Sequence, residues 1–221
     1  MKVAVQFAVG LVLCAILARV FLVMGLIVPV TVAGRSMAPT FHGPHVAAVC
    51  PNCGEVTRAD VDPQLPTQIV CSVCSRPIET EDQPTRAGDS IWIDRTAYVM
   101  RPPRRWEVVV FQCPNDATQL CVKRVLGLPG ERIAFRDGEL FVDDERVPKP
   151  FAIDYEIRHG DGIGQAEFDS RQQCWQLGMG YFVVGDNQSV SYDSRNWPAG
   201  PDLPVRLIVG RPIGRSDPPT D

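Results

Sequence analysis

The chain has 221 residues, with 22 Lys or Arg against 26 Asp or Glu, so its formal net charge at pH 7 is -4. A phosphate-binding domain usually carries a basic excess, so this balance argues against nucleic acid as the main partner. The length allows one sizeable globular domain in addition to an apolar N-terminal stretch.

The N-terminal stretch, Val3 to Val28, is apolar apart from Gln6 and Arg19. About twenty such residues suffice for a membrane-spanning helix, and the run from Val3 to about Leu22 has this length. We therefore predict a transmembrane anchor followed by an interfacial segment over residues 1–28. Arg19 near the outer end of the helix can extend its charge to the lipid headgroups.

A cleavable signal peptide is the alternative for this stretch. Lys2 provides a short positive region, and Thr31-Val32-Ala33 resembles a small-x-small cleavage site. The apolar run is longer than the usual 7–15 residues of a signal peptide, which favours the anchor. Because the same tripeptide looks like a substrate, self-cleavage between Ala33 and Gly34 is a further hypothesis.

Four cysteines in residues 46–80 have the spacing of a metal site. They form two C-x2-C pairs, Cys50 with Cys53 and Cys71 with Cys74, separated by seventeen residues. This spacing predicts a four-cysteine structural zinc site in a zinc-ribbon-like insertion. Two disulfides are the alternative, which an oxidising compartment would favour.

The rest of the chain alternates short apolar runs with Pro and Gly. The runs are rich in β-branched and aromatic residues and are too short for helices, so we predict a mainly antiparallel β domain. A hairpin is expected where Ile133 and Phe135 alternate, Asp137-Gly138 turns, and Leu140 and Val142 return. The predicted strands are Ser90–Asp94, Glu107–Phe111, Cys121–Leu126, Tyr181–Val184 and Arg206–Val209.

Two further features concern the remaining cysteines and the C-terminal end. Cys113 and Cys121 flank a short polar stretch and can face each other across a hairpin, so a disulfide between them is a hypothesis. Cys14 lies in the apolar segment, and Cys174 is left over. Residues 215–221 are polar and Pro-containing and are predicted to be a disordered tail.

Three segments carry candidate chemistry: Gly34-Arg-Ser-Met-Ala-Pro-Thr40, Val122-Lys-Arg-Val-Leu-Gly-Leu-Pro-Gly-Glu131 and Gly185-Asp-Asn-Gln-Ser-Val-Ser-Tyr-Asp-Ser-Arg195. Taken singly, each reads as an ordinary loop serine, a solvent-facing strand lysine or a polar turn. Together, in this order and after an apolar segment, they resemble the motifs of type I signal peptidases, peptidase family S26. The resemblance covers nearly all of the chain except about residues 45–80 and 150–175.

This resemblance implies a serine endopeptidase in which Ser36 is the nucleophile and Lys123 the general base. A serine hydroxyl attacks only when a base takes its proton, and a lysine can do so when it is neutral. Val122, Val125 and Leu126 around Lys123 are apolar, and desolvation lowers the pKa of a lysine. The three histidines, His42, His45 and His159, offer no convincing alternative base.

The resemblance also assigns supporting roles. Ser191 would orient the Lys123 amine, and Asp186, Asp193 and Arg195 would hold the site together as scaffold. Arg124 is expected on the strand face opposite Lys123. Gly34 replaces a serine found in some family members, so backbone N–H groups, including that of Ser36, would form the oxyanion hole.

Substrates implied by the resemblance are signal-peptide-bearing precursor proteins, cut after small-x-small sites. The peptide would lie extended beside residues 30–33, with Val30, Val32 and Met37 as candidate substrate-binding residues. No catalytic cofactor is implied. We expect a monomer in contact with membrane lipid, single-pass in a bacterial-type plasma membrane, with the catalytic domain on the extracytoplasmic side.

The predicted organisation is a mainly β fold with an antiparallel β-sheet signal-peptidase catalytic domain over residues 29–45 plus 81–214. The transmembrane helix precedes this domain, and the insertion at 46–80 interrupts it. Two alternative functions are a membrane-tethered zinc-ribbon binding protein on a peptidase scaffold and a self-cleaving Ser–Lys repressor. The intact Ser36, Lys123, Ser191 and Asp193 set argues against the first, and the lack of a DNA-binding module argues against the second.

Overall fold

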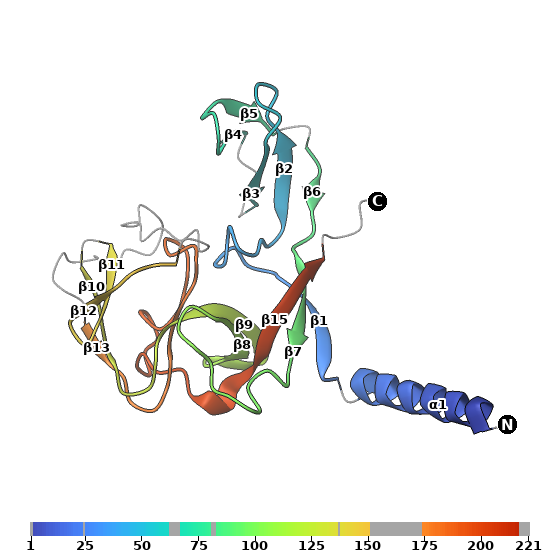
Figure 1. Ribbon diagram of the computed structural model, residues 1–221. Coiled ribbons are helices and arrows are strands. Elements are labelled where there is room, and N and C mark those ends of the chain that lie inside the picture. Colours follow the sequence, from blue (N-terminus) through green and yellow to red (C-terminus); the bar gives the residue numbers. More distant parts are fainter. Residues whose placement is uncertain are drawn as a thin grey trace.

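The structure is a computed structural model that describes residues 2–23, 25–61, 67–80, 83–136, 138–150 and 174–216. Antiparallel strands dominate this part of the chain, as predicted (Figure 1). The helical elements within it are α1 (Lys2–Val23) and the 3-10 turn η1 (Val205–Leu207). The strands are β1 (Ile27–Thr31), β2 (His45–Val49), β3 (Val56–Asp60), β4 (Gln68–Val70), β5 (Pro77–Glu79), β6 (Thr85–Arg86), β7 (Ser90–Asp94), β8 (Val108–Cys113), β9 (Asp116–Gly127), β10 (Arg132–Arg136), β11 (Glu139–Val142), β12 (Glu145–Val147), β13 (Cys174–Gln176), β14 (Phe182–Val184) and β15 (Ile208–Ser216).

The largest sheet of the described chain has the strand order β1-β7-β15-β8-β9-β14. Its first strand, β1, therefore lies at an edge and contains Pro29, which edge strands tolerate. On the other side, β14 pairs with β9 only from Arg124 to Gly127. No described strand pairs with this edge of β9 before Arg124, so backbone groups there are free to bind another strand.

Strand β14 separates two apolar clusters because successive side chains of a strand point to opposite faces. Phe182 and Val184 pack with Leu126 in one cluster, whereas Val183 packs with Val125 in the other. All five side chains are completely buried. The clusters fix β9 and β14 from both faces, and β9 carries the predicted base.

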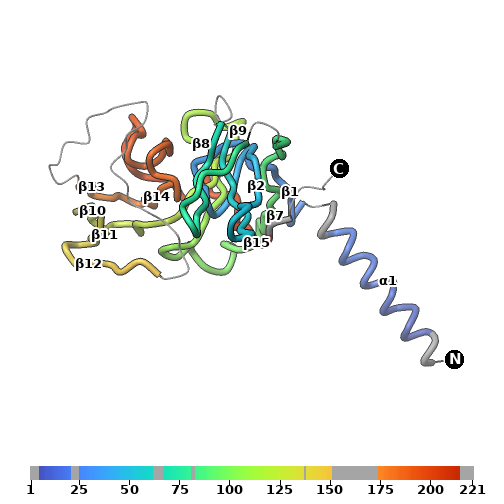
Figure 2. Tube along the Cα trace, turned by 90° about the horizontal axis from the view of Figure 1, so that it is seen from above, coloured from blue at the N-terminus to red at the C-terminus, as the bar shows by residue number. Residues whose placement is uncertain are grey.

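A smaller sheet, β12-β11-β10-β13, lies at the end of the molecule opposite α1 (Figure 2). The predicted hairpin is confirmed, because Ile133 pairs with Val142 and Phe135 with Leu140. Its turn includes Gly138 in a left-handed conformation (φ 78°), and Asp137 lies outside the described residues.

The cysteine-rich segment stands up from the main sheet as a separate unit (Figure 1). We call described residues 45–61, 67–80 and 83–86 the cysteine unit. It contains the sheet β3-β2-β6 and the ribbon β4-β5. His45 pairs with Arg86 in this sheet, and the two residues lie on either side of the predicted insertion, 46–80.

The chain ends differ from the predictions in three ways. Within the described residues, no helix is both long and apolar enough to cross a membrane, so the predicted transmembrane helix is not confirmed. Ile27 and Val28, predicted to belong to the interfacial segment, lie in β1 and pair with Asp94 and Ile93 of β7, after a turn in which Gly25 is left-handed (φ 59°). Arg215 and Ser216 of the predicted tail pair with Ile91 and Ser90, and the tail's residues 217–221 lie outside the described chain.

The strand predicted over Arg206–Val209 begins only at Ile208. Val205–Leu207 form a 3-10 turn instead, closed by a hydrogen bond from the Leu207 N–H to the Pro204 carbonyl. Pro204 precedes this turn in an extended conformation, with φ -63° and ψ 137°.

Candidate active site

Two segments far apart in sequence bring a serine and a lysine together. Ser36 lies in a turn after β1, and Lys123 lies on β9 opposite Val109 of β8. The Lys123 Nζ donates a hydrogen bond to the Ser36 Oγ over 2.5 Å. Lys123 is only 5% exposed and Ser36 is half-buried, so this polar contact is partly shielded from water.

Burial changes the acidity of the lysine. Desolvation lowers the pKa of Lys123 from 10.5 to about 8, because an ammonium loses its hydration in an apolar site. The nearby charge of Arg195 lowers it further, whereas Asp193 and Asp186 oppose the change. At slightly alkaline pH the amine is therefore neutral in a large fraction of molecules and can accept a proton.

Arg124 follows Lys123 on β9, and its side chain makes its contacts on the opposite face of the strand. Its guanidinium donates to both carboxylate oxygens of Asp186, over 2.7 and 2.6 Å, and to the Trp106 carbonyl over 2.8 Å. The Asp186 side chain also accepts a 2.5 Å hydrogen bond from the Thr40 hydroxyl. This buried pair thus links β9, the loop after β14 and the end of the nucleophile turn.

Asp193 forms a second buried junction. Arg195 donates two 2.8 Å hydrogen bonds to its carboxylate, and the Gly185 N–H donates another over 3.0 Å. Arg195 also contacts the side chain and the carbonyl of Gln188. The loop 185–195 is therefore closed on itself, which fits the scaffold role predicted for Asp186, Asp193 and Arg195.

Ser191 differs from the prediction in its contacts. Its hydroxyl is buried and has no hydrogen-bond partner among the described residues, so the expected bond to the Lys123 amine is not present in this structure. Ser191 lies instead against Gly185. A Cβ at Gly185 would come within 2.3 Å of both the Ser191 Oγ and the Ser36 carbonyl oxygen. Only glycine allows these segments to approach so closely.

A pocket of about 420 Å³ opens onto Ser36 and Lys123. One wall is the β8–β9 hairpin, where the predicted disulfide between Cys113 and Cys121 is confirmed. The Asn115 side chain reaches across to the Tyr192 hydroxyl over 3.1 Å. The pocket is lined by Gly34, Arg35, Ser36, Cys113, Pro114, Asn115, Asp116, Gln119, Cys121, Lys123, Val190, Tyr192 and Trp197.

The candidate substrate-binding residues are placed unequally. Val30 is half-buried on the edge strand β1, and Val32 is buried, with its N–H donating to the Asp89 carbonyl over 2.8 Å. Met37 is 1% exposed, so it packs in the interior and does not present its side chain to a substrate. Gly34 is exposed at the pocket.

The bond proposed for self-cleavage lies close to the nucleophile in sequence. The Ala33–Gly34 bond lies only a few residues before Ser36, and the preceding Val32 is fixed to Asp89.

The four predicted metal-binding cysteines also converge, in the cysteine unit. The Sγ atoms of Cys50, Cys53, Cys71 and Cys74 all lie within 4.8 Å of one another. Cys14 and Cys174 are exposed free cysteines.

Several contacts in the site were not predicted from the sequence. Thr40, Gly185, Gln188, Asn115 and Tyr192 all join segments around the pocket or the loop 185–195. All of these except Asn115 stood inside the quoted motifs, which is the one signal that points to them.

Comparison with known proteins gives matches over most of the chain. The family described as "Signal peptidase, peptidase S26" matches residues 65–214. Signal peptidase I of Bacillus caldolyticus is 31% identical over 128 residues, covering 57% of this chain and 68% of the relative. Signal peptidase I V of Bacillus subtilis (strain 168) is 30% identical over 126 residues, covering 56% of this chain and 72% of the relative.

A plant relative matches a smaller share of its own length. The thylakoidal processing peptidase 1, chloroplastic, of Arabidopsis thaliana is 29% identical over 144 residues, which are 60% of this chain but 38% of the relative. The family match includes Lys123 and the loop 185–195, whereas Ser36 lies before it. The assignment of Ser36 therefore depends on its motif and on its contact with Lys123.

Proposed function

Because the chain belongs to the signal peptidase family, peptidase S26, we propose that it removes signal peptides from precursor proteins, with Ser36 as nucleophile and Lys123 as general base. The observation that carries this proposal is the 2.5 Å contact between the Nζ of the buried Lys123 and the Ser36 Oγ, at a pocket that both residues line. Both groups come from one chain, so a monomer suffices to complete the pair.

The proposed chemistry begins when Lys123 is neutral. Its lone pair then takes the Ser36 hydroxyl proton as the oxygen attacks the scissile carbonyl. The oxyanion that forms is stabilised by backbone N–H groups near Gly34 and Ser36. Lys123 next returns its proton to the leaving amine, and a water molecule, activated in the same way, releases the acyl group from Ser36. These steps require no catalytic cofactor.

The substrate is proposed to bind as an extended strand that ends at the pocket. Two unpaired backbone edges support this proposal: the outer edge of β1 near Val30 and the edge of β9 before Arg124. Strand addition provides backbone hydrogen bonds, and shallow pockets then select small side chains. Ser191 is proposed to donate to or accept from the Lys123 amine once substrate binding reorders the loop, because its buried hydroxyl is otherwise unsatisfied.

Membrane association is proposed to occur through α1, with the catalytic domain on the extracytoplasmic side of a bacterial plasma membrane. Most of the described α1 side chains are apolar, and they are exposed, Phe7 to 74% and Leu11 to 68%. A free apolar surface of this kind is typical of lipid contact. The disulfide between Cys113 and Cys121 also supports the extracytoplasmic side, since disulfides persist in oxidising compartments.

The function is tested by cleavage of a precursor with an A-x-A site in detergent. We expect Ser36→Ala and Lys123→Met to reduce product formation by about 10³-fold or more, because nucleophile and base act as a unit. Ser189→Ala is the matched control, since Ser189 is an exposed serine in the same polar loop that bonds only to Asn187 among the described contacts. Thermal unfolding of each variant shows whether the fold is intact. Full activity in folded Ser36→Ala or Lys123→Met would refute the mechanism.

A further inference from the structure

The cysteine unit contains two turns with the same backbone geometry. In the first, the Gly54 N–H donates to the Cys50 carbonyl over 2.9 Å, and the Cys50 N–H donates to the Glu55 carbonyl over 2.7 Å. The second turn repeats both bonds, with Ser75 donating to Cys71 over 3.0 Å. Gly54 and Ser75 occupy equivalent positions, and both are left-handed, with φ of 76° and 58°. Two matching C-x2-C turns thus face each other.

The sulfur positions fit a tetrahedral metal site. Cys50 and Cys74 lie 3.5 Å apart and Cys53 and Cys71 3.6 Å apart, and all four sulfurs lie within 4.8 Å of one another. A Zn–S bond of about 2.3 Å gives a tetrahedron with edges of about 3.8 Å, so these distances need only small adjustments. A disulfide would need sulfurs about 2.0 Å apart.

The unit has little else to hold it together. Its buried cluster consists of Ala48, Cys50, Ile69, Cys71 and Ile78, and Val46 of β2 is also fully buried. Four small aliphatic side chains and two cysteines bury too little apolar surface to offset the conformational entropy of a unit this size. In such small units, metal binding supplies the free energy of folding.

We propose that the cysteine unit binds one Zn²⁺ through Cys50, Cys53, Cys71 and Cys74, and that this ion holds the unit's base against the residues that precede the nucleophile. The proposed metal site is separate from the catalytic pair, Ser36 and Lys123, whose proposed chemistry uses no metal. The same chain also carries a formed disulfide at Cys113 and Cys121. In an oxidising compartment, metal coordination would protect the four thiolates of the cysteine unit from forming disulfides.

The base of the unit touches the nucleophile segment through backbone. A Cβ at Gly43 would lie 3.0 Å from the Ala33 and Gly34 carbonyl oxygens, and one at Gly88 would lie 1.8 Å from the Val32 carbonyl oxygen. Gly43 lies two positions before β2, the first strand of the unit, and Gly88 lies two positions after β6, its last strand. The entry and exit of the unit therefore pack on the three residues before Arg35 and Ser36.

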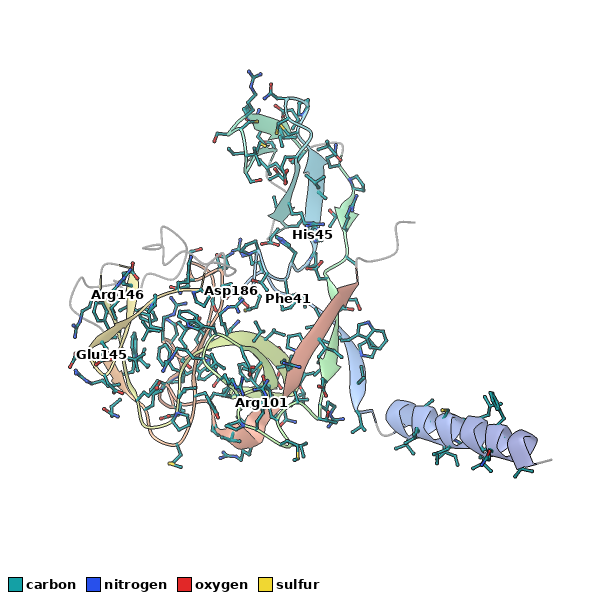
Figure 3. All side chains as sticks on the ribbon, in the orientation of Figure 1. Phe41, His45, Arg101, Glu145, Arg146 and Asp186 are labelled. Atoms are coloured by element: carbon teal, nitrogen blue, oxygen red, sulfur yellow. A yellow bond between two sulfur atoms is a disulfide. The ribbon has the colours of Figure 1, made fainter. Side chains whose placement is uncertain are left out.

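Polar contacts also stabilise the end of the cysteine unit that packs on the nucleophile segment. The Asp89 carboxylate accepts the His42 N–H over 2.8 Å, and the His42 Nδ1 lies 3.0 Å from an Asp60 carboxylate oxygen on β3. The His45 ring lies 5.2 Å from the His42 ring. Figure 3 shows His45 at the base of the unit, with Phe41 below it on the side of the catalytic domain. A loss of order in β2 and β3 would therefore release His42, and through Asp89 also Val32.

Metal content is the first test, made on the full chain carrying Ser36→Ala so that no result depends on proteolysis. We expect about one Zn²⁺ per chain, and a tetrahedral thiolate absorption when Co²⁺ replaces it. Cys53→Ser is expected to lose the ion, and Cys174→Ser, an exposed free cysteine outside the unit, to keep it. Should Cys53→Ser fail to fold, release of zinc from the parent by a thiol-reactive mercurial gives the same measurement.

The outcome that overturns the metal site is two disulfides in the unit, seen as an absence of titratable thiols at Cys50, Cys53, Cys71 and Cys74 together with no bound zinc. The metal site is also overturned if the four cysteines are free thiols and the chain still binds neither Zn²⁺ nor Co²⁺. Neither outcome bears on the Ser36 and Lys123 chemistry, because the zinc measurement does not use activity.

Hydrogen exchange tests the link to the nucleophile segment in the same Ser36→Ala protein. Zinc removal is expected to speed amide exchange at Val32 and in residues 41–45 by about tenfold or more, because the loaded unit no longer holds their partners in place. Val109, Val110 and Phe111 of β8 are the internal reference and should not change. Equal exchange at Val32 with and without zinc would show that the unit is independent of the active site.

Discussion

At the scale of single residues, Lys123 determines when the site can react. Desolvation lowers its pKa to about 8, so the amine is largely protonated at pH 6 and largely neutral at pH 9. Since only the neutral form accepts the Ser36 proton, we expect kcat/KM to rise about tenfold per pH unit below 8 and to level off above it. Cleavage of a peptide without titratable groups near the scissile bond, measured from pH 6 to 10, checks this. A midpoint near 6.5, the ordinary pKa of histidine, would contradict a lysine base.

The same pKa predicts how stability depends on pH. Lys123 binds its proton less tightly in the folded chain, with a pKa of about 8, than at its ordinary value of 10.5. Between these values the unfolded chain binds more protons, so Lys123 makes the free energy of unfolding rise with pH across this window. Lys123→Met should remove this part of the slope. An unchanged slope in the mutant would mean that the lysine is not desolvated.

At the scale of elements, the pair formed by Arg124 and Asp186 joins β9 to the loop 185–195. Both side chains are buried, 8% and 0% exposed. Asp186→Ala would leave the Arg124 guanidinium buried without its partner, and we expect it to lower the free energy of unfolding by about 3–5 kcal/mol. Glu139→Ala is the matched control: its pair with Arg146 is 43% and 59% exposed, and exposed pairs contribute at most about 1 kcal/mol. Urea unfolding of both variants measures the difference, and equal losses would argue against the structural role of Asp186.

The elements were predictable from sequence where local chemistry determines them. Ser90–Asp94 forms the predicted strand, and Ile133 and Val142 pair as the hairpin pattern indicated. The contacts between segments were not predictable in this way. Thr40 with Asp186 joins residues 146 positions apart, and nothing local in either segment marks the other. The close approach of Gly88 to Val32 is likewise a property of the packed chain, although glycine is what makes it sterically possible.

At the scale of the whole molecule, α1 stands apart from the β domains in both views (Figures 1 and 2). Its described apolar side chains are exposed, so the catalytic domain does not depend on them for its core. We expect deletion of residues 2–20 to change the free energy of unfolding of the catalytic domain by less than about 0.5 kcal/mol, because the described side chains of this stretch, 5–20, are all exposed. Flotation with vesicles of bacterial lipid should be lost in the same variant.

A charged variant separates contact with lipid from the presence of the helix. Leu11→Asp with Leu17→Asp, in the full chain, places two carboxylates on residues that are 68% and 51% exposed. Charges at these positions oppose burial in hydrocarbon while leaving the catalytic domain untouched, so flotation should fall and cleavage of a soluble peptide should persist. A several-degree loss of Tm in either variant would show that α1 packs on the catalytic domain. Undiminished flotation in both would place the lipid-binding surface elsewhere on the chain.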